Sequence, residues 1–434
     1  MGSRVGVVGA GYVGLTSAAC LASLGHHVTC ADNDQSKVDE LARGEVTLVE
    51  PDLERLVREG LAEQRLRFTA ELAEVAESEV VLLCLPTPMG QGGAADLGAV
   101  ESVLDILAGL LAPGCVLVTK STVPVGTSAR LANLLGRSDI AVVSNPEFLR
   151  EGHAVHDFLH PDRIVIGALA AEREAADRVT ELCAGTAAPV LRTDAASAEL
   201  AKYASNAFLA VKASYVNILA ELCEQVGADI GDVTSAMGLD DRIGRHFLAP
   251  GPGWGGSCLP KDATALLRMA DAAGVDFALV REAVRANARQ RATVLRKVRR
   301  AITGSPAGSL AGVRIGLLGL AFKAGTGDLR DSPAVAIADE LSHQGAVLTA
   351  YDPGVPPSAG RRLEGTRVVD DPYLVAEDAA AIVVLTEWPE FRDLDWNRLA
   401  TLAERAVVID TRNLLDGKVL AGTPFRHTGI GVPA

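Results

Sequence analysis

The sequence has no long apolar run. No stretch reaches about eighteen uninterrupted apolar residues, the length that a membrane-spanning helix needs. Residues 1–4 lack the basic, apolar and small-residue regions of a secretory signal peptide and lead directly into a strand-like segment. We therefore expect a cytoplasmic protein that does not associate with a membrane.

Cysteine is scarce, and its spacing suggests no pairing. The seven cysteines form no Cys-x-x-Cys pair and no zinc-ribbon spacing, and their number is odd. This pattern favours a reducing cytosol, in which most cysteines fill space in the core. We expect that buried, structural role for Cys20 and Cys84.

An excess of positive charge is also missing. The formal net charge is −14, the pI is near 5.1, and no basic run exceeds a few residues. Nucleic acid and anionic membranes repel such a protein on average, so we expect neither as a partner. A local basic pocket for a phosphorylated small molecule is compatible with this charge.

What is present is a globular composition, 48% apolar and 22% charged, over 434 residues. That length exceeds one ordinary core and indicates two or three domains. The strand-like runs 4–9 and 313–319 each lead into a helical pattern and then a second apolar run, which ends in Asp32 or Asp352. We interpret both segments as βαβ units. Further apolar runs follow at residues 80–85, 116–119, 140–144, 164–167, 382–385 and 407–410.

Continuous apolar strands that alternate with helices indicate parallel sheets covered on both faces. Between the two units, residues 196–226 contain no proline or glycine and carry apolar residues at helical spacing. More helix is expected over about 264–300, and 303–308 has the composition of a linker. The sequence therefore predicts an α/β protein with two doubly wound, Rossmann-like domains joined by a helical central domain. The predicted boundaries are 1–195, 196–303 and 309–434.

Gly9-Ala10-Gly11-Tyr12-Val13-Gly14 is a GxGxxG motif that follows a strand and opens a helix. In such motifs the first glycine makes a tight turn, the second admits a pyrophosphate to the backbone, and the third lets helix and strand pack closely. The helix amino terminus offers unpaired amide donors to that pyrophosphate. Asp32 stands eighteen residues after Gly14, where it can accept from a ribose 2′-hydroxyl and repel the 2′-phosphate of NADP. We predict an NAD site.

The least ordinary stretch is residues 250–262, rich in glycine and proline around Cys258. Such a composition disfavours regular structure and suits a loop that brings backbone amides close to a ligand. A helix start or a nearby cation such as Lys261 can lower the pKa of a thiol and so activate it. We therefore predict that Cys258 is a nucleophile, although a single cysteine is more often a small core residue.

His153, His156 and His160 recur at a spacing that could gather a metal ion on a helix, as in a zinc alcohol dehydrogenase. Pro161 limits any helix at His160, however. We expect no metal site.

Six motifs in order resemble the UDP-glucose and GDP-mannose dehydrogenase family across essentially the whole chain. They are the GxGxxG motif and the segments 120–127 (KSTVPVGT), 145–152 (NPEFLREG), 199–206 (ELAKYASN), 250–262 (PGPGWGGSCLPKD) and 321–333 (AFK through DSP).

The resemblance implies an NAD-dependent, four-electron oxidation of UDP-glucose to UDP-glucuronate. Cys258 would capture the intermediate aldehyde as a thiohemiacetal, and a thioester would then be hydrolysed. Lys202 and Asn206, at i and i+4, match residues that stabilise the alkoxide and oxyanion. Asp262 matches a residue of the water and proton network, and Thr122 and Glu151 match residues that hold or activate a water. The implied catalytic residues are Cys258, Lys202, Asn206, Asp262, Thr122 and Glu151.

The resemblance also implies binding residues. Those for the cofactor NAD are Gly9, Gly11, Tyr12, Val13, Gly14, Asp32, Lys37, Thr87, Thr122 and Arg330. Those for the nucleotide-sugar are Glu147, Phe148, Leu149, Glu151, Lys202, Asn206, Arg242, Gly255, Phe322, Lys323 and Arg412. The carboxyl-terminal βαβ unit lacks a full GxGxxG and is assigned to the substrate nucleotide. Arg242 matches an arginine that reaches a neighbouring subunit, so a homodimer or higher homo-oligomer is expected.

Three alternatives stay open. The residues around Cys258 favour UDP-glucose or GDP-mannose over N-acetylated sugars, and segment 157–167 resembles the UDP-glucose branch more closely. GDP-mannose is therefore the second candidate substrate. A two-electron hydroxyacid dehydrogenase would use the lysine–asparagine pair but would not need the Cys258 loop. A sensor of sugar-nucleotide or NAD would have lost turnover altogether.

Overall fold

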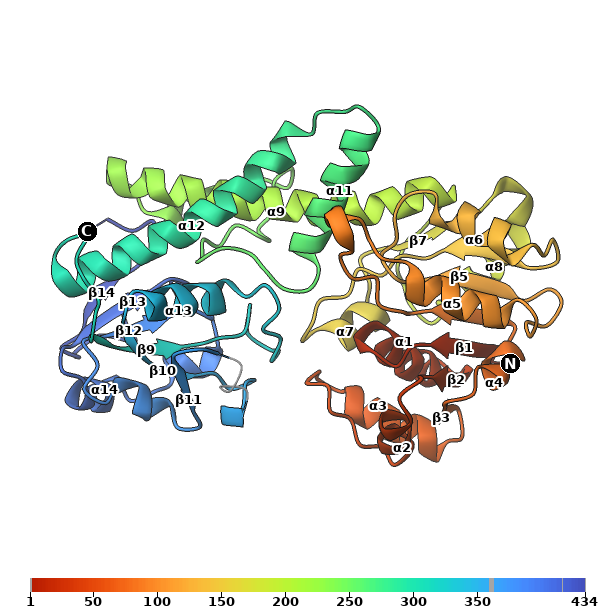
Figure 1. Cartoon of the computed structure of the whole chain (residues 1–434), viewed down its shortest axis with the longest axis horizontal. Coiled ribbons are helices and arrows are strands. Elements are labelled where there is room, and N and C mark those ends of the chain that lie inside the picture. Colours follow the sequence, from red (N-terminus) through yellow and green to blue (C-terminus); the bar gives the residue numbers. More distant parts are fainter. Residues whose placement is uncertain (1, 359–362, 416, 434) are drawn as a thin grey trace. The chain divides into compact units, whose positions relative to one another are not determined.

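The computed structural model describes residues 2–358, 363–415 and 417–433, which form two compact units (Figure 1). The amino-terminal unit comprises Met1–Ser205 and Thr264–Gly274. The carboxyl-terminal unit comprises Asn206–Ala263 and Val275–Ala434. Two helices, α9 (Ala195–Val226) and α11 (Leu259–Ala272), contribute residues to both units.

The amino-terminal unit is built on an eight-stranded sheet with the order β3-β2-β1-β4-β5-β6-β7-β8. Its strands are β1 (Arg4–Val8), β2 (His27–Ala31), β3 (Leu66–Thr69), β4 (Val80–Leu83), β5 (Val116–Thr119), β6 (Ala141–Ser144), β7 (Ile164–Gly167) and β8 (Val190–Thr193). Its helices are α1 (Tyr12–Ser23), α2 (Gln35–Ala42), α3 (Leu53–Ala62), α4 (Leu72–Ala76), α5 (Gly98–Leu107), α6 (Thr127–Leu135), α7 (Ala154–Leu159) and α8 (Arg173–Leu182).

Side chains that alternate along each strand explain why both faces of this sheet are covered. In β1, Val5 and Val7 pack with apolar residues of α1, α3, α7 and α8, whereas Val8 packs with those of α4, α5 and α6. Both faces are therefore buried, as the continuous apolar run predicts.

One part of the sheet departs from the expected parallel arrangement. β6 and β7 are antiparallel and pair only through Ser144 and Gly167. An antiparallel neighbour needs no long crossover, and only the short helix α7 lies between these strands. The Asn145 side chain fastens the junction, because its amide donates to Val165 O (2.8 Å) while its carbonyl accepts from Lys120 Nζ (3.0 Å).

The carboxyl-terminal unit repeats the pattern in a six-stranded parallel sheet with the order β11-β10-β9-β12-β13-β14. Its strands are β9 (Arg314–Leu318), β10 (Val347–Tyr351), β11 (Thr366–Val369), β12 (Ala381–Val384), β13 (Val407–Asp410) and β14 (Arg426–Thr428). Its further helices are α10 (Ile230–Gly238), α12 (Ala278–Thr303), α13 (Pro333–His343) and α14 (Trp396–Leu402). The predicted fold class, two doubly wound sheets with a helical central region, is confirmed.

The central helices differ from the sequence prediction in two places. The helical stretch expected over about 264–300 consists of two helices, α11 and α12, because Gly274 takes a left-handed φ of 71° and ends α11. Helix α10 was not expected. Its start is capped by the Asp229 carboxylate, which accepts from the backbone amides of Gly231 and Asp232.

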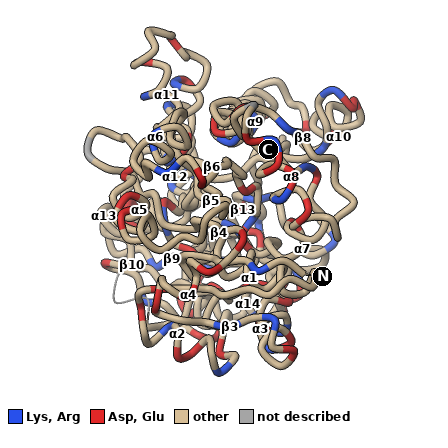
Figure 2. The backbone as a smooth tube through the Cα atoms, turned by 90° about the vertical axis from the view of Figure 1, so that its right-hand side faces the viewer, with Lys and Arg blue, Asp and Glu red and all other residues tan. Residues whose placement is uncertain are grey.

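In the view of Figure 2, acidic and basic residues are spread over the whole tube. Among the residues that the structure describes, no helix is both long and apolar enough to cross a membrane.

A buried carboxylate joins α9 to α6 within the amino-terminal unit. Glu199 of α9 is 2% exposed and accepts from Gly126 N (2.6 Å), Ser128 N (2.8 Å) and Ser128 Oγ (2.7 Å) at the start of α6. It therefore satisfies donors at a helix amino terminus, where a negative charge is also favourable.

Replacing Glu199 with alanine should lower the free energy of unfolding by about 2–5 kcal/mol, because it leaves several donors without an acceptor. Urea unfolding followed by circular dichroism measures this. The control is Glu59→Ala, which removes an exposed ion pair with Arg55 and should cost about 0–1 kcal/mol. Equal losses in the two variants would contradict the anchoring role of Glu199.

Candidate active site

The glycine motif after β1 has the geometry of a dinucleotide loop. Gly9 has φ 97°, and a Cβ there would lie 2.6 Å from Cys84 O. A Cβ on Gly14 would lie 1.7 Å from Gly9 O, so α1 could not pack so close to the loop with any other residue. A Cβ on Gly11, in contrast, would meet no described atom within 4 Å. The first and third glycines thus serve the fold, and the second leaves space beside the start of α1.

Asp32, at the carboxyl end of β2, lies beside this loop. Its Oδ2 accepts from Ala10 N (2.8 Å) and Lys37 Nζ (3.1 Å), and its Oδ1 accepts from Asp34 N (3.1 Å). Burial alone would raise the pKa of this carboxyl, but the hydrogen bonds from Ala10, Asp34 and Lys37 outweigh burial and hold the pKa below its usual value. Asp32 is therefore an anion at neutral pH, and the structure places Lys37 next to it.

Thr87 and Thr122 come together from the loops after β4 and β5, because Thr87 Oγ1 donates to Thr122 O at 2.8 Å. The carboxyl ends of parallel strands share one edge of a sheet, so these threonines lie on the same edge as the glycine loop and Asp32. That edge is where doubly wound proteins bind ligands.

The loop after β6 adds a buried ion pair. Glu147 Oε1 accepts from Lys202 Nζ of α9 at 3.0 Å, and its Oε2 accepts from Leu149 N at 2.6 Å. Both charged side chains are less than a tenth exposed. The Phe148 ring lies 5.3 Å from Lys202 Nζ and 3.9 Å from Arg163 Cζ. The structure thus brings Glu147, Phe148, Leu149 and Lys202 together.

The same loop is tied to the glycine motif through a residue that sequence reasoning missed. Glu151 precedes Gly152, whose amide donates both to Tyr12 Oη (2.8 Å) and to Glu50 Oε2 (2.7 Å). Glu50 is 8% exposed. The one available signal was a charged residue just before Pro51 in a segment with no assigned motif.

In the carboxyl-terminal unit, helices α9 and α12 hold the glycine-rich loop by its backbone. Gly251 N donates to Asn217 Oδ1 and Gly251 O accepts from Gln290 Nε2, both at 2.8 Å. Asn287 pairs with the amide and carbonyl of Trp254, each at 2.8 Å. The loop that presents the cysteine is therefore rigidly bound.

The two glycines before Ser257 allow this loop to pack on the segment after β9. A Cβ on Gly255 would lie 2.0 Å from Asp331 O, and one on Gly256 would lie 2.8 Å from the Phe322 ring. Gly255 and Phe322, both predicted to contact substrate, thus belong to one packed cluster.

Cys258 immediately precedes α11 and is partly exposed. The Sγ atom lies 3.6 Å from Ser257 Oγ. Four residues on, Asp262 is fully buried; its Oδ2 accepts from Asn206 Nδ2 (2.6 Å) and its Oδ1 from Lys261 Nζ (2.7 Å). Three of the predicted catalytic residues, Cys258, Asp262 and Asn206, therefore lie together.

Cys20 and Cys84 have the buried, structural environment predicted for them. They are 0% and 7% exposed, and burial raises the pKa of each thiol to about 12. Neither is a thiolate at neutral pH.

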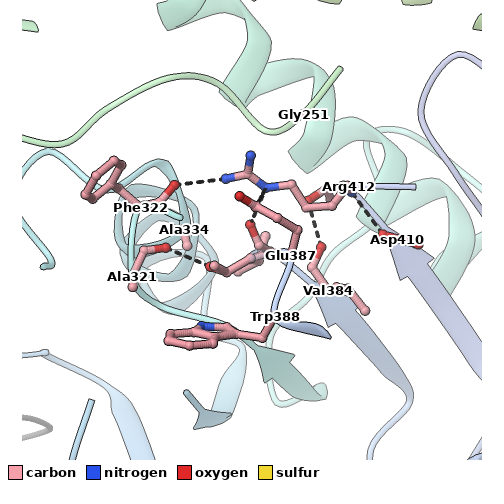
Figure 3. Close-up of polar contacts among 12 residues, drawn as sticks. Gly251, Ala321, Phe322, Ala334, Val384, Glu387, Trp388, Asp410 and Arg412 are labelled. Atoms are coloured by element: carbon pink, nitrogen blue, oxygen red, sulfur yellow. Dashed lines mark hydrogen bonds and ion pairs between the residues drawn. The ribbon is translucent and has the colours of Figure 1, made fainter. Parts of the chain in front are cut away.

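Arg412 follows β13 and is held by several acceptors (Figure 3). Its Nε lies 3.0 Å from both Leu385 O and Glu387 Oε2, and its Nη2 donates to Phe322 O at 3.1 Å. Lys323 Nζ lies 5.9 Å from the Phe322 ring centroid. Arg412, Phe322 and Lys323 thus lie near one another at the carboxyl edge of the second sheet.

Two predicted arginines stand on the surface. Arg242 pairs with Asp240 at 2.6 Å and its side chain is 88% exposed, and Arg330 pairs with Asp328 at 2.6 Å with 68% of its side chain exposed.

Of the three histidines whose spacing could suit a metal ion, only His156 lies within α7, because His153 and His160 flank it. Within the described ranges, no three His, Cys, Asp or Glu side chains cluster so as to hold a metal ion.

A glycine loop with room at its second glycine and an ionised acid beside it are features of a dinucleotide-binding domain. Residues 3–184 match the NAD binding domain of the UDP-glucose/GDP-mannose dehydrogenase family, 196–289 its central domain and 316–417 its UDP binding domain.

Individual relatives agree with that match. A UDP-glucose 6-dehydrogenase of Rhizobium meliloti (strain 1021) is 42% identical and aligns with 99% of this chain and 100% of its own length. One of Bacillus subtilis (strain 168) is 41% identical, covering 99% of this chain and 94% of that protein. The solved structure of a UDP-glucose dehydrogenase from Pyrobaculum islandicum matches with a TM-score of 0.89 at 34% identity, covering 100% and 98% of the two chains.

This chain belongs to the UDP-glucose/GDP-mannose dehydrogenase family. It is an NAD-dependent nucleotide-sugar dehydrogenase.

The environment of Asp32 leads to a prediction about the cofactor. NAD should be preferred over NADP, and the preference should not change between about pH 7.5 and pH 9, because the lowered pKa keeps Asp32 ionised and the 2′-phosphate of NADP, with its second pKa of about 6, is doubly charged throughout. Asp32→Ala should weaken NAD binding and narrow the preference. Dissociation constants for both cofactors, measured by calorimetry across that range, provide the check. Equal affinity of the unmodified protein for the two cofactors would rule out a contact between Asp32 and the ribose.

Proposed function

We propose that this chain oxidises UDP-glucose to UDP-glucuronate, with Cys258 as the nucleophile that retains the intermediate aldehyde. The observation that carries the proposal is the position of Cys258 at the start of α11, one turn before the buried Asp262–Asn206 pair. A thiol at a helix amino terminus is favoured as the reactive thiolate.

Cys258 would hold the sugar carbon first as a thiohemiacetal and then as a thioester. The thiolate sulfur adds to the aldehyde carbon, and the carbonyl electron pair moves to oxygen, which takes a proton to give a thiohemiacetal. Loss of a hydride from that carbon and of the hydroxyl proton leaves a thioester. Water then adds to the thioester carbonyl, the thiolate departs, and the two protons of the water are released as the carboxylate forms. Each molecule of NAD, when bound, accepts one hydride. The change from alcohol to carboxylate removes two hydrides, so it consumes two molecules of NAD.

Lys202 and Asn206, one turn apart on α9, would stabilise the negative oxygen that develops in these steps. Each is less than a tenth exposed, and each is held by a carboxylate, Glu147 for Lys202 and Asp262 for Asn206. Such prepositioned donors are worth about 3–4 kcal/mol of transition-state stabilisation. Glu151 and Thr122 would hold the hydrolytic water, and Asp262 would exchange protons with it.

UDP-glucose is the proposed substrate because the relatives reported above are named for it and because Ser257 precedes the nucleophile. Arg412 and Lys323 would bind the diphosphate, since guanidinium and ammonium groups pair well with phosphate oxygens. We also propose that the chain is organised as an NAD-binding domain (1–195), a helical domain with the nucleophile loop (196–303) and a nucleotide-sugar domain (309–434).

The unmodified protein should form two NADH for each UDP-glucose consumed and release UDP-glucuronate. Absorbance counts the NADH, and mass spectrometry identifies the product. Under saturating NAD, kcat/KM should be highest for UDP-glucose among UDP-glucose, GDP-mannose, UDP-N-acetylglucosamine and UDP-N-acetylmannosamine. One NADH per sugar would indicate a two-electron dehydrogenase instead. A higher kcat/KM for GDP-mannose would contradict UDP-glucose as the substrate but would be compatible with the proposed mechanism.

Two matched cysteine variants test the nucleophile. Cys258→Ala should abolish uronate formation while NAD still binds. Cys183→Ala, which also changes a partly exposed cysteine, should keep full activity. Normal uronate formation by Cys258→Ala would show that this cysteine is structural.

We further propose that the chain forms a homo-oligomer through α9. Phe208, Tyr215, Ile218 and Leu222 recur at spacings of seven, three and four residues, and each side chain is more than half exposed. Apolar residues at such spacing form one stripe along a helix, as in helix pairs that pack together. If the stripes of two copies packed against each other, their apolar side chains would be buried. Arg242 of one copy would then contact the second copy.

The unmodified protein should therefore have at least twice the 45.1 kDa mass of one chain in light scattering. Replacing Ile218 and Leu222 together with lysine should yield monomers, because charges would then face each other in the interface. Val347→Lys, which changes an equally exposed residue of β10, should leave the mass unchanged. A monomeric unmodified protein would exclude this assembly.

A further inference from the structure

Glu50 is a buried carboxylate for which the proposed reaction has no use. It lies between α2 and α3, and its carboxylate contacts both the glycine motif and the segment 152–155 of the amino-terminal unit. Oε2 accepts from the Tyr12 hydroxyl and from Gly152 N, and Oε1 accepts from Val155 N at 3.3 Å. Every described partner of this carboxylate is therefore a donor at the glycine motif or at the start of α7.

Tyr12 is a hydrogen-bond donor to Glu50 at all ordinary pH values. Burial, together with the neighbouring carboxylate, raises the pKa of its phenol far above the usual range. The phenol oxygen accepts from Gly152 N at 2.8 Å at the same time. Tyr12, Glu50 and Gly152 therefore form a closed triangle of hydrogen bonds.

The triangle connects two functional segments. Tyr12 immediately follows Gly11, the glycine with open space beside it, and Gly152 immediately follows Glu151. A change at Tyr12 reaches Gly152 through one hydrogen bond, without passing through the sheet. The amide of Gly152 is held in a left-handed turn of φ 78°, so a small shift there redirects the residue before it.

We propose that Glu50 is a positioning residue that couples occupancy of the dinucleotide loop to the placement of Glu151. The inference rests on the proposed function in taking Glu151 as a residue of the reaction. NAD bound at Gly11 restricts Tyr12, and the shared carboxylate transmits that restriction to Gly152 and Val155. By reciprocity, an ordered segment 150–158 strengthens NAD binding by the same factor.

Hydrogen exchange tests the coupling without any turnover. NAD should slow amide exchange in peptides covering 150–158 of the unmodified protein by about fivefold or more. In Tyr12→Phe, which removes only the hydroxyl, this slowing should be lost and the NAD dissociation constant should rise by the same factor. NAD-induced slowing that persists in Tyr12→Phe, or that is missing from the unmodified protein, would overturn the proposal.

Steady-state kinetics distinguish a positioning role of Glu50 from a role in the stability of the fold alone. Glu50→Gln should lower kcat about tenfold or more, since a small misplacement of a catalytic group is costly, while KM for the nucleotide-sugar stays nearly constant. Glu74→Gln, which alters a carboxylate bound to Thr69 and Arg67 of β3, should change neither constant. An unchanged kcat in a less stable Glu50→Gln protein would mean that Glu50 serves only the fold. If the unmodified protein oxidises no nucleotide-sugar, the proposed function fails while the exchange result stands on its own.

Discussion

A carboxylate buried away from water must be surrounded by donors, because an unpaired buried charge costs several kcal/mol. The amino-terminal unit buries three such groups, Glu50, Glu147 and Glu199, each less than a tenth exposed. All three accept backbone amides from loops at the carboxyl edge of the sheet, and Glu147 also accepts from Lys202. The buried carboxylates thus hold in place the loops that carry the candidate site. The positions of these loops follow from the need of each buried carboxylate for hydrogen-bond donors.

The two βαβ units show how one topology acquires different chemistry. Asp32 and Asp352 occupy the same position after the second strand of each βαβ unit. Each carboxylate accepts a hydrogen bond from a backbone amide in the turn after the first strand, Ala10 N for Asp32 and Leu320 N for Asp352. Asp352 is only 3% exposed and also binds Gly354 N and Trp388 Nε1, and burial raises its pKa. Its oxygens are committed to the protein, so Asp352 serves the fold of the second unit.

The central strands could be predicted from the sequence because burial on both faces leaves continuous apolar runs. The strands that were not predicted are the outermost ones of both sheets, where one side is open and each sequence includes an arginine: β3, β8, β11 and β14. The site divides in the same way. Lys202 and Asn206 share one motif and could be predicted as site residues from it, whereas Glu50 could not be predicted, because its partners Tyr12 and Gly152 are 38 and 102 residues away.

Helix α9 fixes the spacing between two of its buried polar residues, Lys202 and Asn206. Lys202 meets Glu147 and, four residues later, Asn206 meets Asp262, so the two share one side of a continuous helix. An insertion or deletion of one residue between them would turn everything beyond it by about 100° and shift it by about 1.5 Å. The two contacts therefore depend on the number of residues that separate Lys202 from Asn206. Loops elsewhere in the chain are free of this restriction and can absorb differences in length.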